Sequence, residues 1–143
     1  MSAADPHNLQ RFIEEQASDS SYDRAHTELT AGRKRSHWMW YVFPQIEGLG
    51  SSYMAQRFAI QSREEAQAYL AHPVLGARLR ELTRIVNGIE GRRIDEIFHD
   101  PDDMKFRSSM TLFAAATDDN AEFRQALEKY FEGKPDPLTL QRL

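Results

Sequence analysis

Apolar residues between positions 75 and 89 recur at steps of four, three, four and three, and this spacing is the strongest constraint that the sequence places on its fold. The residues are Leu75, Leu79, Leu82, Val86 and Ile89. These steps place all five side chains on one face of an α-helix. Shorter runs with the same period lie within residues 9–13, 22–29, 106–113 and 123–131. The sequence therefore predicts an all-α fold, a compact single-domain bundle of about six to eight short helices.

Residues typical of helix ends separate these runs. The dipeptide Asp-Pro, which predicts an N-cap followed by proline in the first turn, occurs at Asp5-Pro6, Asp100-Pro101 and Asp136-Pro137. Ser62 and Glu65 have the spacing of a capping box. A glycine follows three of the periodic runs, where a left-handed residue typically ends a helix, at Gly32, Gly88 and Gly133.

The composition predicts one ordinary domain that requires no covalent or metal cross-link. The chain has 143 residues and no Cys, which excludes disulfides and thiolate metal sites. We expect residues 1–143 to form a single domain, with residues 1–7 as a flexible N-terminal segment. The five histidines show no zinc-binding spacing, so we predict no metal site and no cofactor.

The distribution of charge and hydropathy argues against two classes of partner. The formal net charge is −4, and no long basic stretch is present, so we do not expect nucleic-acid binding. No apolar run approaches the ~20 residues of a membrane span, and the first residues lack the pattern of a signal peptide. We therefore expect a cytoplasmic protein that engages no membrane. The sequence leaves the oligomeric state open.

The most unusual segment is aromatic: six of the seven residues from position 38 to position 44 are aromatic or bulky and apolar. A lone strand makes no sheet, so we expect a buried helical turn or an extended segment through the core. Trp38 and Trp40 have two roles open to them, as core anchors or as walls of a pocket, and alternate side chains allow both. In the second role, Lys34 and His37 at the rim would engage an anion or move a proton.

Two further stretches are candidates for the same site. The glycine-rich stretch at 48–52 predicts an anion site if a helix opens near Ser51, although a simple turn with a serine N-cap is the stronger interpretation because the phosphate-binding motifs are incomplete. In the helix predicted after Pro101, Asp103 lies on one face and Lys105 and Ser109 on another. Serines at 108 and 109 in mid-helix favour either close helix packing or a polar cleft equally.

The predicted site combines these segments. We predict that His37 acts as a general acid or base and that Asp103 supplies a carboxylate. The predicted ligand contacts are Lys34, Trp38, Trp40, Gln45, Ser51, Lys105 and Ser109.

Four motifs of the chain resemble a widespread bacterial family, domain of unknown function 1810. They read KRSHWMWYVFPQ at 34–45, GLGSS at 48–52, HPVLGARL at 72–79 and PDDMKFRSSMTLF at 101–113. The resemblance extends from about residue 8 to the last residue and implies a compact, mainly helical single domain without an established activity. Members of the family sometimes carry the name calpastatin, but no feature of this sequence supports protease inhibition.

A second, shorter resemblance concerns residues 70–75, which are similar to the Asn-Pro-x-Leu helix start of N-glycosidase domains linked to NAD and ADP-ribose (the NADAR type). That likeness implies a carboxylate that stabilises an oxocarbenium-like transition state. Glu47, Asp102 and Asp103 are the candidates, and the sequence does not choose among them.

Three hypotheses follow for the function. The first is a pocket for a flat-ringed or phosphorylated small molecule, with or without catalysis. The second is an NAD- or ADP-ribose-linked N-glycosidase, and the third is a non-catalytic interaction domain whose aromatic segment is core. The first requires His37, Lys105 and Ser109 to converge on one concave pocket beside an exposed tryptophan face. Whether the protein is an enzyme stays open at this point.

Overall fold

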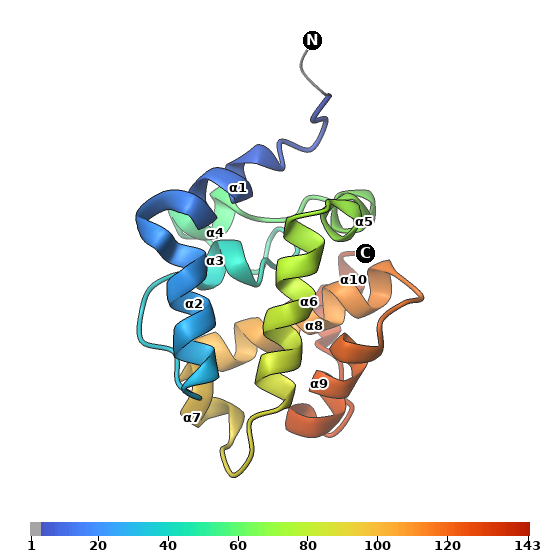
Figure 1. Ribbon diagram of the computed structural model, residues 1–143. Helices are drawn as coiled ribbons and strands as arrows, with labels where there is room; N and C mark the ends of the chain where they lie inside the picture. The colour runs from blue at the N-terminus through green and yellow to red at the C-terminus, as the bar shows by residue number, and fades with distance from the viewer. Residues whose placement is uncertain (1–3) are drawn as a thin grey trace.

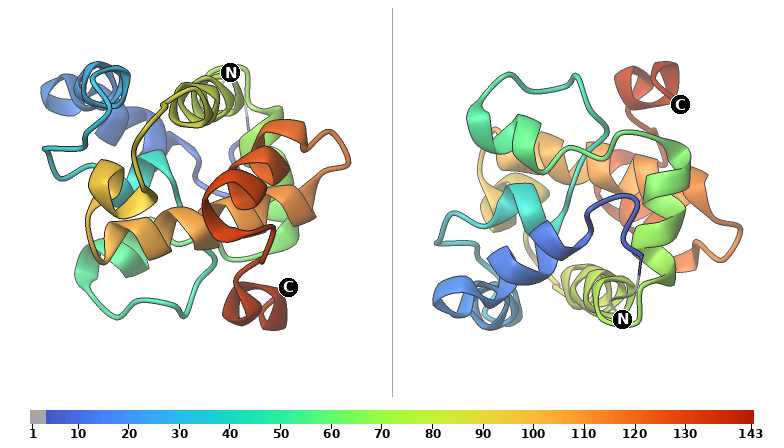
Figure 2. Two further views of the ribbon diagram at one scale, coloured as in Figure 1. Left: turned by 90° about the horizontal axis from the view of Figure 1, so that it is seen from below. Right: turned by 90° about the horizontal axis from the view of Figure 1, so that it is seen from above.

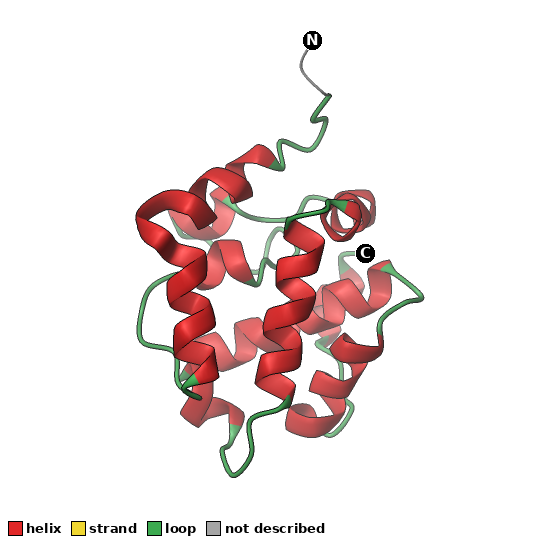
Figure 3. Cartoon of the chain, in the orientation of Figure 1, coloured by secondary structure: helices red, strands yellow, loops and turns green. Residues whose placement is uncertain are grey.

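The computed structural model describes residues 4–143, and within this part of the chain it contains ten α-helices, one 3-10 helix and no strand (Figures 1 and 3). The helices are α1 (Gln10–Ala17), η1 (Ser18–Ser20), α2 (Ser21–Thr30), α3 (Met39–Val42), α4 (Tyr53–Arg57), α5 (Arg63–Ala71), α6 (Leu75–Asn87), α7 (Ile94–Phe98), α8 (Asp102–Ala116), α9 (Ala121–Phe131) and α10 (Pro137–Gln141). The all-α prediction is confirmed. The expected count of about six to eight helices was too low, because four helices of only four or five residues carry no full apolar period.

Helix α8 lies at the centre of the bundle. It packs against α5, α7, α9 and α10, and it runs behind α6 in Figure 1. Its buried residues include hydrophobic and polar side chains on nearly every face: Phe106, Ser108, Ser109, Met110, Thr111, Leu112, Phe113 and Ala116. A helix surrounded by neighbours has no single apolar stripe, which is why its apolar period is weak in the sequence.

Helix α6 shows the opposite pattern, with one buried face and one exposed face. Its stripe residues Leu75, Leu79, Leu82 and Val86 are at most 1% exposed. This face packs toward α2, α5 and α9. The fifth residue of the predicted stripe, Ile89, lies just beyond the helix end and packs against the core while partly buried.

The predicted helix ends are confirmed in part. Asp136 caps α10 and accepts a hydrogen bond from the Leu138 backbone, with Pro137 in the first turn. The Ser62 hydroxyl caps α5 by accepting from the Glu65 backbone. Asp100 was wrongly predicted as a cap, because α8 begins at Asp102 without a side-chain cap.

The predictions for the glycines and for the N-terminal segment are also confirmed only in part. Gly32 and Gly133 have φ of 84° and 74°, as expected after helices, but Gly88 has φ of −82°, so the left-handed conformation predicted there was wrong. Residues 1–3 of the expected flexible segment lie outside the described residues. Asp5 within it accepts hydrogen bonds from the Leu9 and Gln10 backbones.

The aromatic segment forms the short helix α3, so the expectation of a buried helical turn is confirmed. The chain then leaves α3 in an extended loop that is tied to a second loop by an isolated bridge between Ile46 and Ile60. The Glu47 backbone N–H donates to the Ile60 carbonyl at 2.8 Å, and the Ile60 N–H donates to the Gln45 carbonyl at 2.8 Å. These bonds hold the loop at 43–52 in place between α3 and α4. No helix of the described residues is long and apolar enough to cross a membrane.

Candidate functional site

A cleft with a volume of about 740 Å³ opens where three separate parts of the chain meet. One wall is the loop at 45–52 with the start of α4, the second is the N-terminal half of α8, and the third is α10 with Asp136 and Arg142 at its ends. In both views of Figure 2, α4 and α10 lie on the same side of α8. The lining residues are Trp40, Gln45, Gly48, Leu49, Gly50, Ser51, Ser52, Ala55, Pro101, Met104, Lys105, Ser108, Asp136, Leu138, Gln141 and Arg142.

Trp40 and Lys105 form the aromatic and cationic part of the lining. The Lys105 ammonium lies 5.0 Å from the centroid of the Trp40 ring, a cation–π distance. Asp102 lies behind this pair, with Oδ1 3.3 Å from the Lys105 Nζ and Oδ2 2.8 Å from the Lys34 Nζ. One carboxylate therefore bridges two lysines, of which only Lys105 lines the cleft.

The opposite wall is built around Arg142. Its guanidinium pairs with the Glu47 carboxylate at 3.1 Å and so joins the C-terminal end of α10 to the loop at 45–52. Gly48 has φ of 90°, and a Cβ there would lie 1.9 Å from the Arg142 Nη2. A Cβ on Gly50 would lie 2.8 Å from the Ala55 Cβ. The structure thus gives both glycines of the loop a steric partner within the protein. The Ser52 hydroxyl caps α4, which agrees with the stronger of the two sequence interpretations, a turn with a serine N-cap.

Asp136 joins α10 to α8 at the third side of the cleft. Its carboxylate accepts from the Ser108 hydroxyl at 2.7 Å and from the Thr139 hydroxyl at 2.6 Å, and its own backbone N–H donates to the Thr111 hydroxyl at 2.9 Å. Burial alone would raise the pKa of Asp136, but the hydrogen bonds from Thr139 and Ser108 outweigh it and lower the pKa below its usual value. Asp136 is therefore a charged anchor with its oxygens already engaged.

Trp38 lies in the core, whereas Trp40 lines the cleft. Glu28 holds the chain just before α3 in this arrangement. The Glu28 carboxylate accepts from the Arg35 and Ser36 backbones at 2.7 and 2.9 Å, from the Ser36 hydroxyl at 2.5 Å and from the Trp38 indole N–H at 3.0 Å. Burial raises the pKa of Glu28, but the effect of these hydrogen bonds is larger, so the pKa is lowered below its usual value. Trp38 is consequently 1% exposed and packs on Phe43 and Phe98, so it cannot contact a ligand in the cleft.

The structure brings four of the predicted contacts together in this cleft: Trp40, Gln45, Ser51 and Lys105. The other predicted residues lie elsewhere. Lys34 and Ser109 are buried, and the Ser109 hydroxyl has no hydrogen-bond partner among residues 4–143. The predicted convergence of His37, Lys105 and Ser109 on one pocket is absent from the structure, because His37 lies in a different hollow and Ser109 is buried.

The two predicted catalytic residues occupy two further hollows. His37 is exposed in a hollow lined by Arg24, Arg35 and Tyr41. Asp103 lies in another, beside Arg93 and Tyr130. Partial burial raises the pKa of Asp103 above its usual value, and the neighbouring carboxylates of Asp100 and Asp95 raise it further. The predicted acid or base, His37, and the predicted carboxylate, Asp103, therefore do not lie in one site.

The cleft also contains residues that the sequence analysis did not select. Ser108 lines it where Ser109 was predicted, and Asp136 and Arg142 come from the far end of the chain. The Asp136-Pro137 cap was visible in the sequence, but nothing indicated that its carboxylate reaches α8. Among the described residues, no group of three or more His, Cys, Asp or Glu side chains is arranged to hold a metal ion.

Comparison with known families shows the class of protein to which the chain belongs. The model of a family described as "Protein of unknown function (DUF1810)" matches residues 6–143, and the chain belongs to that family. The resemblance seen in the sequence motifs is thus confirmed.

One solved structure is similar over nearly its whole length. It is the crystal structure of the conserved hypothetical protein Rv1873 from Mycobacterium tuberculosis, which is 55% identical in sequence. The match covers 97% of this chain and 98% of the mycobacterial one, with a TM-score of 0.95. A search of curated proteins finds no match.

Proposed function

We propose that the cleft between α4, α8 and α10 binds a small molecule that carries a flat ring or a phosphate. The observation that carries this proposal is the Trp40 indole in the cleft wall, with the Lys105 ammonium 5.0 Å from its ring centroid. An indole face stacks on flat rings, and an ammonium beside it attracts negative charge. The volume of about 740 Å³ also suits a ligand of nucleotide size.

The polar groups around Trp40 support recognition of such a ligand. Gln45, Ser51 and Ser52 bring amide and hydroxyl groups to the loop wall, and Met104 and Leu138 contribute apolar side chains to the lining. Small-molecule sites typically combine a mainly apolar lining with a few polar groups that fix orientation.

The carboxylates favour binding over catalysis. Glu47 pairs with Arg142, Asp102 bridges two lysines, and Asp136 accepts from two hydroxyls. A glycosidase-like reaction needs a carboxylate that faces the reacting carbon. An NAD- or ADP-ribose-linked N-glycosidase is therefore the weaker alternative, because each of these carboxylates already has a partner inside the protein and the remaining candidate, Asp103, lies in a different hollow.

The third hypothesis, a non-catalytic interaction domain, draws support from exposed apolar side chains on the same helices. Tyr53 on α4 is 74% exposed, Met104 on α8 is 46% exposed and Leu138 on α10 is 59% exposed. Exposed apolar groups that border a concavity are typical of binding surfaces for proteins as well as for ligands. The two hypotheses differ in whether a small molecule alone stabilises the protein.

A thermal-shift screen against nucleotides and sugar phosphates, including AMP, FMN, NAD and ADP-ribose, tests the proposal. A ligand at 100 times its dissociation constant stabilises the folded protein by about 2.7 kcal/mol. We expect at least one compound to raise the unfolding midpoint of the wild type but not that of a Trp40→Leu variant. Tyr22→Leu, which removes an aromatic ring outside the cleft lining, should keep the shift. The absence of any shift would argue for the interaction domain, and a shift that survives Trp40→Leu would place the ligand elsewhere.

A further inference from the structure

The charges around the cleft are equal in number but unevenly placed. The group Lys34, Asp102 and Lys105 has one excess positive charge. Asp136 on the third side is, by contrast, a negative charge without a paired cation among residues 4–143. Asp102 provides a single negative charge between the ammonium groups of Lys34 and Lys105. Lys34 holds the closer position, at 2.8 Å, and its Nζ also donates to the Ser36 carbonyl at 2.6 Å. Its side chain is 8% exposed. Asp102 is thus mainly the partner of the buried lysine.

Lys105 keeps unused hydrogen-bonding capacity on the cleft side. An ammonium group has three N–H donors, and within the described residues Asp102, at 3.3 Å, is the polar partner that the structure gives it. The Lys105 side chain is 26% exposed and lies over the Trp40 ring. A positive charge held this way, half compensated and partly dehydrated, is well placed to bind an anion.

The other charged groups of the lining do not compete for this role. Arg142 is neutralised by Glu47 across the opposite wall. Asp136 meets α8 at Ser108, three residues or about one turn beyond Lys105, and hydroxyl donors engage its carboxylate. An anion in the cleft is therefore attracted to the end where Lys105 and Trp40 lie and away from Asp136.

We infer that the ligand of this cleft combines a planar ring with an anionic group a short distance from it, and that Lys105 binds the anion while Trp40 contacts the ring. This inference rests on the proposed function and narrows its ligand class. Phosphate monoesters of ring compounds have this chemistry, and so do ring carboxylates. Lys34 takes no part in the contact and acts as a positioning residue through Asp102.

Isothermal titration with matched pairs of compounds tests the inference. The pairs are adenosine and AMP, and riboflavin and FMN, with nicotinic acid against nicotinamide for a carboxylate. For a pair that binds, we expect the anionic member to bind the wild type at least about tenfold more tightly, a preference that weakens with added salt. Lys105→Gln should remove the preference and leave the affinity of the neutral member unchanged. Lys105→Arg should retain the preference.

The matched control is Lys134→Gln, which removes an exposed lysine paired with Glu132 outside the cleft and should leave both affinities unchanged. An unchanged unfolding midpoint for Lys105→Gln verifies that it is folded. Suppose that ring compounds bind the wild type. If Lys105→Gln keeps the preference for the anionic member, or weakens the binding of both members equally, the inference is overturned while the cleft proposal stands. If no compound of any pair binds the wild type, the proposed function is overturned and the inference falls with it.

Discussion

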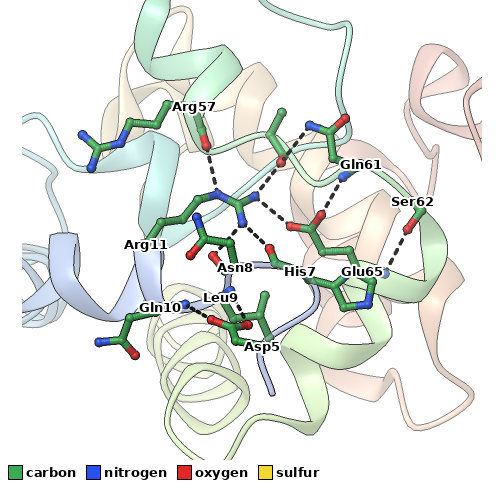
Figure 4. A network of polar contacts seen from close by, with 11 residues as sticks. Asp5, His7, Asn8, Leu9, Gln10, Arg11, Arg57, Gln61, Ser62 and Glu65 are labelled. Carbon is green, nitrogen blue, oxygen red and sulfur yellow. Dashed lines mark hydrogen bonds and ion pairs between the residues drawn. The ribbon is translucent and has the colours of Figure 1, made fainter. Parts of the chain in front are cut away.

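The guanidinium of Arg11 on α1 lies 2.7 Å from the carboxylate of Glu65 on α5, and the two side chains are 12% and 3% exposed (Figure 4). Arg11 also donates to the backbone carbonyls of His7, Asn8, Arg57 and Ala59. All five N–H donors of the guanidinium are thus engaged. The pair fastens the N-terminal segment and the loop after α4 to α5.

Replacement of Arg11 by Met should therefore destabilise the protein strongly. It leaves the carboxylate of Glu65 buried without its cation and removes a side-chain donor from each of four backbone carbonyls. Removing one partner of a buried pair costs about 3–5 kcal/mol. Urea unfolding measures the change in the free energy of unfolding. The exposed Arg124, for which the structure gives no side-chain bond, is the matched control, and Arg124→Met should stay within about 0.5 kcal/mol of the wild type. Equal losses for the two variants would contradict this role of Arg11.

Gly76→Ala should destabilise the protein, even though Ala in a helix interior is about 1 kcal/mol more favourable than Gly. A Cβ at Gly76 would lie 2.0 Å from the carbonyl oxygen of Leu70, and this backbone atom of α5 cannot swing aside. We expect a loss of about 2 kcal/mol or more from overpacking. At Gly88, at the end of the same helix, the nearest atoms would lie at an ordinary 3.5 Å and φ is negative, so Gly88→Ala should be neutral or slightly stabilising. Chemical denaturation measures the free energy of unfolding. An unchanged value for Gly76→Ala would show that α5 and α6 are not in close contact there.

Gly48→Ala should disturb the cleft wall through Arg142. Both Gly48 and Gly91 have positive φ, which costs an alanine about 1–2 kcal/mol. Only Gly48 has a neighbour that a Cβ would strike, the Arg142 guanidinium, whereas nothing lies within 4 Å of Gly91. We expect Gly48→Ala to cost more than Gly91→Ala, and the excess to disappear in an Arg142→Ala background. An excess that persists without Arg142 would contradict this account of the wall.

Asp136 should make the stability of the protein depend on acidity. Because its pKa in the folded protein is lowered below the ordinary value of 3.8, its contribution is present above that value and is lost as pH falls through the folded pKa. Asp136→Asn keeps the size of the side chain but not its charge, and should cost about 1.5–3 kcal/mol at neutral pH. The difference from the wild type should shrink between about pH 5 and pH 2. A difference in unfolding free energy that stays constant over this range would contradict the hydrogen-bonded carboxylate.

The sequence predicts well what a single helix face determines. The stripe from Leu75 to Val86 gave α6 because one side of that helix is buried and the other is exposed. The caps at Ser62 and Asp136 were predictable for the same reason, since each acts on the backbone within its own first turn.

The site was predicted less well because neighbouring residues on a helix point in different directions. Ser108 lines the cleft while Ser109 is fully buried, and successive residues differ by about 100° around the helix axis. The same holds around α3, where Trp38 is core and Trp40 lines the cleft. Choosing the correct member of each pair requires knowledge of what packs on each side.

Contacts between distant parts of the chain left no signal at all. Arg11 meets Glu65 across 54 positions, and Ser108 meets Asp136 across 28. Arg11, Glu65 and Asp136 are each ordinary polar residues near a helix end. Ser108, although unusual in mid-helix, gives no indication of its partner. The wall that α10 contributes to the cleft was therefore invisible in the sequence, although the helix itself was marked by its cap.

The chemical shifts of the two indole N–H groups test most directly whether the cleft binds a ligand through Trp40. Trp38 donates its indole N–H to Glu28 in the core, so its signal is an internal reference, and Trp40 reports on the cleft. In a two-dimensional ¹H–¹⁵N spectrum, titration with a compound that raises the unfolding midpoint should shift the Trp40 signal and leave that of Trp38 in place. A stabilising compound that leaves the Trp40 signal unmoved would contradict the account.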